Sequence, residues 1–305
     1  MKKVFIDGSV GTTGLRIVER LAGRKDLELI RLDEEHRKDA ASRAQALNAA
    51  DVAFLCLPDA AAVEAVELLQ NPDTVVIDTS TAHRVADGWI YGFAELGMRE
   101  ELKTAKRIAN PGCHASGFLA LVAPLVKQGL IPKDAQLSCF SLTGYSGGGK
   151  KMIAEYEAVG RDPLLEGPRL YGLTQSHKHL PEMQKYAGLD SAPVFCPIVA
   201  PFYAGMEVAV PLFGADKDAI CAAYRAYYKS GLVHFVEPAD ENGFLSSAAF
   251  SGRDDMQITV CGNAERLVLV SRFDNLGKGA SGAAIQNMNI VLGVPETTGL
   301  DLGEE

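Results

Sequence analysis

The sequence predicts an α/β fold: a doubly wound, Rossmann-type parallel sheet, followed by a second α+β domain that carries a mixed or antiparallel sheet. Short apolar, β-branched runs alternate with helix-like stretches in the first third of the chain. Longer strand-like runs follow after about residue 135. The 305 residues also exceed the usual length of one domain, about 100–200 residues, so two domains are expected.

The first domain is expected to contain five buried parallel strands, because its strand-like runs are almost continuously apolar rather than alternating. Between them lie helix-like stretches, and Asp59 is the expected N-cap of the third. The predicted strands are 3–7, 27–32, 52–57, 74–78 and 106–109, and the predicted helices are about 12–22, 39–48, 59–70 and 95–103.

The second domain is expected to hold longer strands joined by turns and helices. Its predicted strands are 136–143, 194–200, 205–213, 256–261 and 266–273, with helices near 150–159 and 216–229. A last helix, 279–292, is rich in small residues and is expected to return to the first domain. We therefore predict one domain from residues 1–114 with 279–293 and a second from residues 115–278.

Composition excludes several classes of partner. The net charge is −9 and no basic run occurs, which disfavours nucleic acid. Three apolar residues follow Met1-Lys2-Lys3, far fewer than the roughly 7–15 of a signal peptide, and prolines interrupt the weakly charged stretch 191–215. The six cysteines are scattered without a CxxC pair, as in reduced intracellular proteins. We expect a cytoplasmic protein with no membrane segment.

A glycine-rich loop joins the first predicted strand to the first predicted helix. Glycines let the backbone approach a pyrophosphate closely, and the start of the helix offers N–H groups and a positive dipole end. The spacing is GxxGxxG rather than GxGxxG, and a plain strand–helix turn is the alternative reading. The candidate cofactor-binding residues here are Gly8, Ser9, Gly11, Thr12, Thr13 and Gly14.

The choice of cofactor depends on the residues after the second strand. Asp33 could accept from a ribose 2′-hydroxyl, whereas the nearby basic residues could hold a 2′-phosphate or simply be solvated. The hydroxyls of the glycine loop can add neutral hydrogen bonds to phosphate, so NADP(H) is the predicted cofactor. The basic candidates are Arg31, Arg37, Lys38 and Arg43, of which Arg37 is the preferred one.

The segment Asn110-Pro111-Gly112-Cys113-His114 carries the strongest chemical signal. A strand ends here, Pro-Gly turns the chain, and residues 114–127 read as a helix, so Cys113 lies at a helix N-terminus. The helix dipole favours the thiolate, which is the nucleophilic form. A structural core cysteine is the alternative. We predict that Cys113 is a nucleophile.

Two closely spaced histidines, His177 and His179, precede Pro181, which suits the first turn of a helix. Either imidazole could act as the general acid/base for Cys113. Ordinary surface histidines are one alternative. A metal site from Cys113, His114, His177 and His179 is another, but the spacing matches no usual zinc pattern, so no metal is predicted.

Two further loops could face an anionic substrate. Residues 144–151 (GYSGGGKK) connect a strand to a helix, and residues 80–84 (STAHR) follow the fourth strand. Both could instead be ordinary solvated loops. The candidate substrate-binding residues are Arg84, Asn110 and Lys150.

Six segments taken together resemble the N-acetyl-gamma-glutamyl-phosphate reductases, in particular their shorter form, within the wider group that includes aspartate-semialdehyde dehydrogenase. The segments are GSVGTTG (8–14), NPGCHASG (110–117), GYSGGGKK (144–151), HKHLPE (177–182), PFYAGM (201–206) and KGASGAAIQNMN (278–289). The resemblance implies NADPH-dependent reduction of the acyl phosphate N-acetyl-L-glutamyl 5-phosphate to its 5-semialdehyde, through a cysteine thioester, in L-arginine biosynthesis.

The resemblance also implies roles for single residues. Cys113 matches the family nucleophile, His179 the better candidate for the acid/base and His177 its competitor. Arg84 matches an arginine that holds a substrate anion, and Asn287 an asparagine near the nicotinamide. Residues 80–84 depart from the Ser-Ala-Asp-Phe-Arg of longer forms, although the arginine is kept.

The domain of residues 1–114 with 279–293 is expected to be the dinucleotide-binding domain, and that of residues 115–278 the substrate-binding and dimerisation domain. A homo-oligomer, dimer or tetramer, is expected. Aspartate-semialdehyde dehydrogenase or another acyl-phosphate-linked aldehyde dehydrogenase is the closest alternative. A hydride-only dehydrogenase or a nonenzymatic NADP-binding sensor would not need Cys113.

Overall fold

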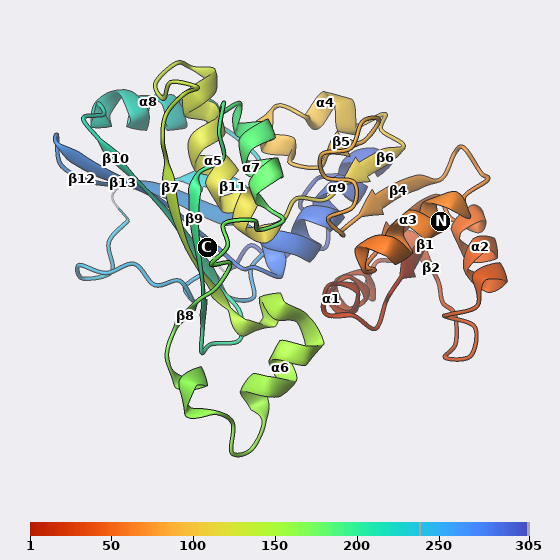
Figure 1. Cartoon of the computed structure of the whole chain (residues 1–305). Helices are drawn as coiled ribbons and strands as arrows, with labels where there is room; N and C mark the ends of the chain where they lie inside the picture. Colours follow the sequence, from red (N-terminus) through yellow and green to blue (C-terminus); the bar gives the residue numbers. More distant parts are fainter. Residues whose placement is uncertain (238, 304–305) are drawn as a thin grey trace. The chain divides into compact units, whose positions relative to one another are not determined.

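The computed structural model describes residues 1–237 and 239–303, and the chain divides into two compact units. The first unit comprises Met1–Pro111 and Ala280–Leu300, so a C-terminal segment completes the fold that the N-terminal residues begin. The second comprises Gly112–Gly279 and the described residues from Asp301 onward. Each unit is built around one sheet (Figure 1).

The first unit contains a six-stranded sheet in the order β2-β1-β3-β4-β6-β5, and all of its neighbouring strands are parallel. This arrangement confirms the predicted Rossmann-type sheet. The strands are β1 (Lys2–Asp7), β2 (Leu27–Ile30), β3 (Val52–Leu55), β4 (Val75–Asp78), β5 (Ile90–Tyr91) and β6 (Arg107–Ala109).

Helices cover both faces of this sheet, which explains why its strands are apolar along their whole length. In β3, Val52 and Phe54 join a core with α1, α4 and α9, while Ala53 and Leu55 join a second core with α2 and α3. Each Val, Leu or Phe side chain that is fully removed from water stabilises the fold by about 1.5–3 kcal/mol. The helices are α1 (Thr12–Leu21), α2 (Ala40–Ala49), α3 (Asp59–Glu67), α4 (Arg99–Leu102) and α9 (Gly282–Leu292).

The strand order reverses at β1, which has β2 on one side and β3 on the other. Ligands of open α/β sheets bind at the carboxyl ends of strands beside such a reversal. Gly8 follows the last residue of β1, so the glycine-rich loop starts at this point.

The second unit contains a seven-stranded sheet in the order β11-β12-β13-β10-β7-β9-β8. β7 pairs in parallel with β9, and β11 with β12, while the remaining neighbours are antiparallel, which confirms the predicted mixed sheet. The strands are β7 (Ser138–Gly144), β8 (Arg169–Leu170), β9 (Val194–Ala200), β10 (Met206–Phe213), β11 (Val233–Phe235), β12 (Met256–Gly262) and β13 (Arg266–Phe273).

The central helix of the second unit is α5 (Cys113–Lys127), which packs on β10 and β13 and contacts α7 (Leu180–Ala187) and α8 (Lys217–Tyr227). A Cβ atom on Gly117 would lie 2.4 Å from the Val208 side chain, so glycine lets this helix approach the sheet closely. α6 (Gly149–Glu157) follows β7, and in Figure 1 the green segment from α6 to β8 extends from one end of the unit.

Some sequence-based predictions were wrong in detail. The helix predicted at 95–103 is a 3₁₀ turn, Ala94–Leu96, followed by the separate α4, because Gly97 has a φ of 93° and breaks the helix. Asp59 is not an N-cap: Pro58 holds that position, and Asp59 is the first residue of α3. The strands β5, β8 and β11 were missed, since two or three residues carry too little pattern. Within the described part of the chain, every helix is too short or too polar to cross a membrane.

Candidate active site

The loop after β1 is a tight turn that only glycine accommodates at two positions. Gly8 has a φ of +83°, and its carbonyl oxygen accepts from the Gly11 N–H at 2.9 Å. A Cβ atom on Gly8 would lie 2.2 Å from the carbonyl oxygen of Cys56, and one on Gly14 would lie 2.4 Å from the carbonyl oxygen of Gly8. The start of α1 is therefore packed directly against the loop.

The N-terminus of α1 suits an anion. Its N-cap, Gly11, makes no side-chain capping hydrogen bond, and its first turn contains no acidic residue. The hydroxyl-bearing residues Ser9, Thr12 and Thr13 are all partly exposed here. The N–H groups and dipole of the helix thus fit the pyrophosphate of a dinucleotide.

The acidic residue near the end of β2 is already engaged. One Asp33 carboxylate oxygen accepts from the His36 backbone N–H at 2.9 Å and lies 2.7 Å from His36 Nδ1. These hydrogen bonds lower the pKa of Asp33, which therefore keeps its negative charge. The Asp33 carboxylate can still accept from a ribose hydroxyl, and its charge would repel a 2′-phosphate.

Of the basic candidates in this region, Arg43 is buried. Its Nη2 lies 2.9 Å from an Asp7 carboxylate oxygen, and its Nη1 lies 3.5 Å from Glu64. Burial raises the pKa of Asp7 even though Arg43 opposes the shift. Arg43 thus holds the end of β1 rather than facing solvent. Arg37 forms an exposed pair with Glu34 at 2.7 Å and is better placed to exchange that partner for a phosphate.

Asn287 and Asn110 meet inside the first unit. Asn287, in α9, is fully buried and donates from Nδ2 to the Gly92 carbonyl oxygen at 2.9 Å and to Asn110 Oδ1 at 3.2 Å. Asn110 in turn donates from Nδ2 to the Ala280 carbonyl oxygen at 2.9 Å. Among the described residues, Asn287 Oδ1 has no hydrogen-bond partner. A buried acceptor of this kind fits the amide group of a nicotinamide.

Arg84 is also buried, and its orientation is fixed by backbone groups. Its Nε donates to the Asn110 carbonyl oxygen at 3.1 Å and its Nη2 to the Thr79 carbonyl oxygen at 3.2 Å. These carbonyls directly follow β4 and β6. The guanidinium charge is thereby held at the carboxyl-terminal edge of the sheet.

Cys113 is the first residue of α5, as predicted. The N-cap, Gly112, has an extended backbone, and its N–H donates to Glu182 Oε2 at 3.0 Å. A Cβ atom on Gly279 would lie 3.0 Å from Cys113 Cβ, so the backbone at residue 279 approaches the cysteine closely. The thiol is half-buried, and the first helical turn behind it contains no acidic residue. This setting favours a thiolate.

The structure brings His179 to Cys113. The Cys113 Sγ atom and one ring nitrogen each of His114 and His179 all lie within 4.8 Å of one another. His179 is buried at the start of α7, and its Nε2 lies 3.9 Å from Glu182 Oε1. The centroids of the His177 and His179 rings lie 4.7 Å apart, and His177 Nδ1 accepts from the His179 backbone N–H at 3.2 Å. His177 is thus adjacent to the cluster.

His114 is held by both of its ring nitrogens. Nδ1 lies 2.7 Å from Ser141 Oγ, and Nε2 lies 2.7 Å from the Tyr171 hydroxyl. Burial, and secondarily the charge of His177, lowers the pKa of His114 to about 3, so the ring is neutral at physiological pH. A metal ion on Cys113, His114 and His179 would have to displace one of these hydrogen bonds.

Sequence reasoning missed three residues near Cys113: Ser141, Tyr171 and Glu182. Glu182 is buried and contacts the N-cap of α5. Its place one residue after Pro181 was visible in the HKHLPE segment, which could have indicated it. No local signal marks Ser141 or Tyr171, because they reach His114 through the pairing of strands.

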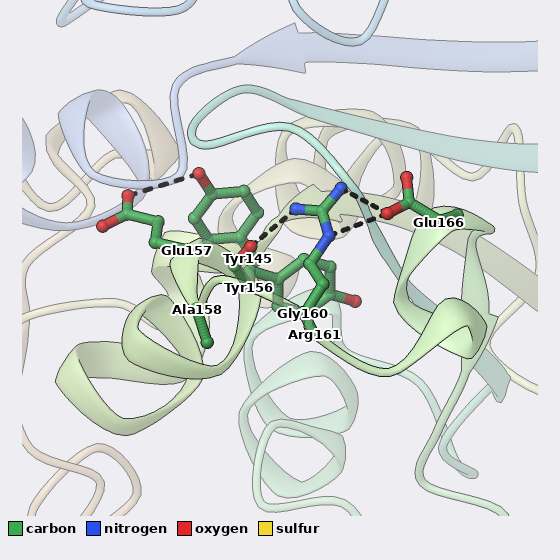
Figure 2. Close-up of a pocket in the computed structure, with 7 residues that line it drawn as sticks. All are labelled: Tyr145, Tyr156, Glu157, Ala158, Gly160, Arg161 and Glu166. Carbon is green, nitrogen blue, oxygen red and sulfur yellow. Dashed lines mark hydrogen bonds and ion pairs between the residues drawn. The ribbon is translucent and has the colours of Figure 1, made fainter.

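Lys150 is exposed in the first turn of α6. A cavity of about 530 Å³ lies near this helix, lined by Tyr145, Tyr156, Glu157, Ala158, Gly160, Arg161 and Glu166 (Figure 2). In Figure 2, Arg161 turns toward Glu166, with which it forms a 2.8 Å ion pair, so two carboxylates outweigh the one guanidinium. This cavity therefore does not suit an acyl phosphate, and none of the predicted site residues lines it.

Comparison with known protein families identifies two matching models. The semialdehyde dehydrogenase NAD binding domain matches residues 3–105, and the semialdehyde dehydrogenase dimerisation domain matches residues 113–275.

Similar proteins cover nearly the whole chain. N-acetyl-gamma-glutamyl-phosphate reductase 2 of Nostoc sp. is 43% identical over 98% of this chain and 99% of its own length. N-acetyl-gamma-glutamyl-phosphate reductase of Mesorhizobium japonicum is 46% identical over 96% and 99%, respectively.

Solved structures share the fold at low sequence identity. Aspartate semialdehyde dehydrogenase II of Vibrio cholerae, complexed with ASA, is 17% identical with a TM-score of 0.71, over 96% of this chain and 98% of that one. Aspartate semialdehyde dehydrogenase of Candida albicans, with NADP, is 14% identical with a TM-score of 0.66, again over 96% and 98%.

Proposed function

Because the chain belongs to the N-acetyl-gamma-glutamyl-phosphate reductase family, we propose that it reduces N-acetyl-L-glutamyl 5-phosphate with NADPH. The products are N-acetyl-L-glutamate 5-semialdehyde and phosphate, in a step of L-arginine biosynthesis. The observation that carries the proposal is the Cys113 thiol at the start of α5 with a His179 ring nitrogen within 4.8 Å. A nucleophile beside a base is what covalent acyl transfer requires.

Cys113 is the proposed nucleophile. Its Sγ forms a bond to the acyl carbon, the carbonyl electron pair moves onto oxygen, and the bond to phosphate then breaks to leave a thioester. The α5 dipole favours the attacking thiolate. When bound, NADPH would supply a hydride to the thioester carbon. The resulting thiohemiacetal would then break its bond to Cys113 Sγ, which releases the aldehyde and restores the thiolate.

His179 is the proposed acid/base. Its ring takes the thiol proton to form the attacking thiolate and later gives a proton to the phosphate oxygen that leaves. The Glu182 carboxylate, 3.9 Å from His179 Nε2, offsets the positive charge of the imidazolium. His177 is less buried than His179, and its ring packs against the His179 ring. We therefore propose that His177 supports His179 rather than replaces it as the acid/base.

The proposed NADPH site uses the glycine loop for the pyrophosphate, Arg37 for the 2′-phosphate and Asn287 Oδ1 for the nicotinamide amide. The loop and Asn287 support this through the positions described above. For the substrate we propose Arg84, whose buried charge is fixed by two carbonyls, with Asn110 and Lys150 as further contacts.

A homo-oligomer of this chain is proposed to form through the uncovered face of the second sheet. Along β7 and β9, alternate residues face away from α5, and Phe140 and Val194 are 43% and 59% exposed there. An apolar sheet face of this kind is typical of an interface. Sedimentation velocity of the wild type and of Phe140→Glu tests this interface, and an unchanged mass in the variant would contradict it.

We also propose a cytoplasmic location, which suits six cysteines that form no disulfide within the described residues.

The central test is to mix the enzyme with N-acetyl-L-glutamyl 5-phosphate without cofactor, quench it, and locate any acyl mass by peptide mapping. We expect acyl-Cys113 in the wild type and none in Cys113→Ala, which should still bind NADPH but lose activity by several orders of magnitude. The His179→Asn variant should be acylated slowly, and the His177→Asn variant should show a smaller decrease in acylation rate. Acylation at another residue would overturn the mechanism.

The substrate itself needs a separate comparison. N-acetyl-L-glutamate 5-semialdehyde and the free-amine L-aspartate semialdehyde should be compared as substrates in the phosphate-dependent reduction of NADP. A preference for free-amine L-aspartate semialdehyde would favour aspartate-semialdehyde dehydrogenase instead.

A further inference from the structure

The His114 side chain links two hydroxyl groups, and its hydrogen bonds specify the direction in which each one donates. Ser141 is fully buried in β7, and within the described residues its hydroxyl has His114 Nδ1 as its one partner. If Nδ1 carried the proton, the Ser141 hydroxyl would accept it, and its own hydrogen would be buried without an acceptor. Ser141 therefore donates to Nδ1.

This direction determines the rest of the chain. A neutral imidazole carries one hydrogen, so when Nδ1 accepts from Ser141 the hydrogen lies on Nε2. Nε2 then donates to the Tyr171 oxygen, 2.7 Å away. The Tyr171 hydroxyl hydrogen is not used by His114 in this arrangement, and Tyr171, unlike Ser141, is only partly buried. It is available to a bound molecule.

Tyr171 is fixed beside the reacting cysteine. Its backbone N–H donates to the Pro197 carbonyl oxygen at 3.0 Å, and its ring lies 5.8 Å from that of His177. Its hydroxyl contacts the ring of His114, the residue next to Cys113, and a His114 nitrogen lies within 4.8 Å of the Cys113 sulfur. Burial, and then the nearby Cys113 thiolate, raises the pKa of Tyr171, so its hydroxyl keeps its hydrogen.

The loop that carries Tyr171 is held in place from its other end. Gln175 has a φ of 55° and forms two hydrogen bonds with the Phe195 backbone, accepting at 2.9 Å and donating at 2.7 Å. These hydrogen bonds anchor the loop, which connects β8 to α7, to strand β9. A donor held on two sides suits the stabilisation of a charge that develops only during the reaction.

We propose that the Tyr171 hydroxyl donates a hydrogen bond to the oxygen of the acyl group while that group is attached to Cys113, and that His114 and Ser141 are positioning residues that orient this donor. The inference rests on the proposed thioester chemistry. When Cys113 Sγ bonds to the acyl carbon, the carbonyl electron pair moves to oxygen, and Tyr171 stabilises this oxyanion without giving up its proton. The oxyanion then collapses and phosphate leaves.

The test measures the acylation rate constant with N-acetyl-L-glutamyl 5-phosphate in rapid-quench experiments on the full-length enzyme. Loss of one oxyanion donor typically lowers the rate by about 100-fold to 1,000-fold. Tyr171→Phe should therefore lower the rate constant at saturating substrate by about 100-fold while the half-saturating substrate concentration changes little. Ser141→Ala should lower the rate constant by a smaller factor and likewise leave the half-saturating substrate concentration almost unchanged, because it removes only the hydrogen bond that orients His114.

Two further variants separate this role from a structural one. In a Tyr171→Phe background, Ser141→Ala should cause no additional loss, because the donor that Ser141 orients is already absent. Tyr224→Phe is the matched control: this buried tyrosine donates to the Leu121 carbonyl oxygen at 2.6 Å in the same unit, and removing its hydroxyl should leave acylation unchanged. Melting temperatures should be measured for all variants.

The outcomes are distinct. A wild-type enzyme that forms no acyl-Cys113 would overturn the proposed function and this inference with it. An acylated wild type together with Tyr171→Phe acylating within about threefold of its rate would overturn the inference alone. Full additivity of Ser141→Ala and Tyr171→Phe would likewise remove the positioning role of His114 and Ser141.

Discussion

Replacing Gly14 by alanine should weaken cofactor binding more than it weakens the fold. The Cβ atom of an alanine at this position would lie 2.4 Å from the Gly8 carbonyl oxygen, whereas ordinary contacts begin at 3.4 Å. The start of α1 must therefore move away from the loop by about 1 Å, a shift that can cost about 100-fold where geometry is critical.

The expected magnitudes for the fold and for binding differ. Overpacking of this kind typically costs about 1–3 kcal/mol, and the better helix propensity of alanine offsets about 1 kcal/mol of it. The free energy of unfolding should thus fall by about 2 kcal/mol or less. The Kd for NADPH should rise about 100-fold, which corresponds to about 2.7 kcal/mol, because the phosphate-binding N–H groups no longer converge.

Gly23→Ala is the matched control, since this exposed glycine follows the same helix and an alanine Cβ atom there would have nothing within 4 Å. Fluorescence titration with NADPH and urea unfolding should be measured for both variants. A Kd for Gly14→Ala within twofold of the wild-type value would refute the assignment of the loop to the pyrophosphate. An equal effect in Gly23→Ala would show that the measurement does not report on the loop.

Three other outcomes are expected. Arg84→Lys should raise the substrate KM by at least about tenfold, because an ammonium group cannot bridge the same two carbonyls and still bind an anion, and wild-type kinetics would contradict this. Arg37→Ala should raise the KM for NADPH but not for NADH, and equal effects on both would remove the 2′-phosphate contact. Because burial, aided by the charge of His177, lowers the pKa of His114 to about 3, the unfolded chain alone gains this proton as the pH falls below about 6.5, so stability should decrease between about pH 6.5 and 3. His114→Gln should flatten that slope in urea unfolding by up to about 1.4 kcal/mol per pH unit, and an unchanged slope would contradict the buried neutral ring.

Much of the first unit could be predicted because its strands carry a local signal. A strand covered on both faces must be apolar at successive positions, and β3 shows this directly in Val52 to Leu55, all fully buried. The two-residue strand β5 has no such pattern and exists because it pairs with β6. The break at Gly97 was equally hidden, since an isolated glycine does not by itself end a helix.

The candidate site divides in the same way. Cys113 could be located because a strand end, a Pro-Gly turn and a helix follow one another within a few residues. Arg43 could not be judged from the sequence, because its burial depends on Asp7, 36 residues away. Ser141 and Tyr171 reach His114 from β7 and from the residue after β8, and only the pairing of both strands with β9 brings them together.

The contrast between His114 and His179 supports different roles for two histidines that both approach Cys113. His114 is bound by two neutral hydroxyls in a buried setting that disfavours charge, so it can orient a donor but is a poor proton carrier. His179 faces the Glu182 carboxylate, which offsets the charge that a proton carrier must acquire. Groups with such opposed surroundings are how a site separates positioning from proton transfer. The acid/base should therefore be sought at His179, and the orientation of the oxyanion donor at His114.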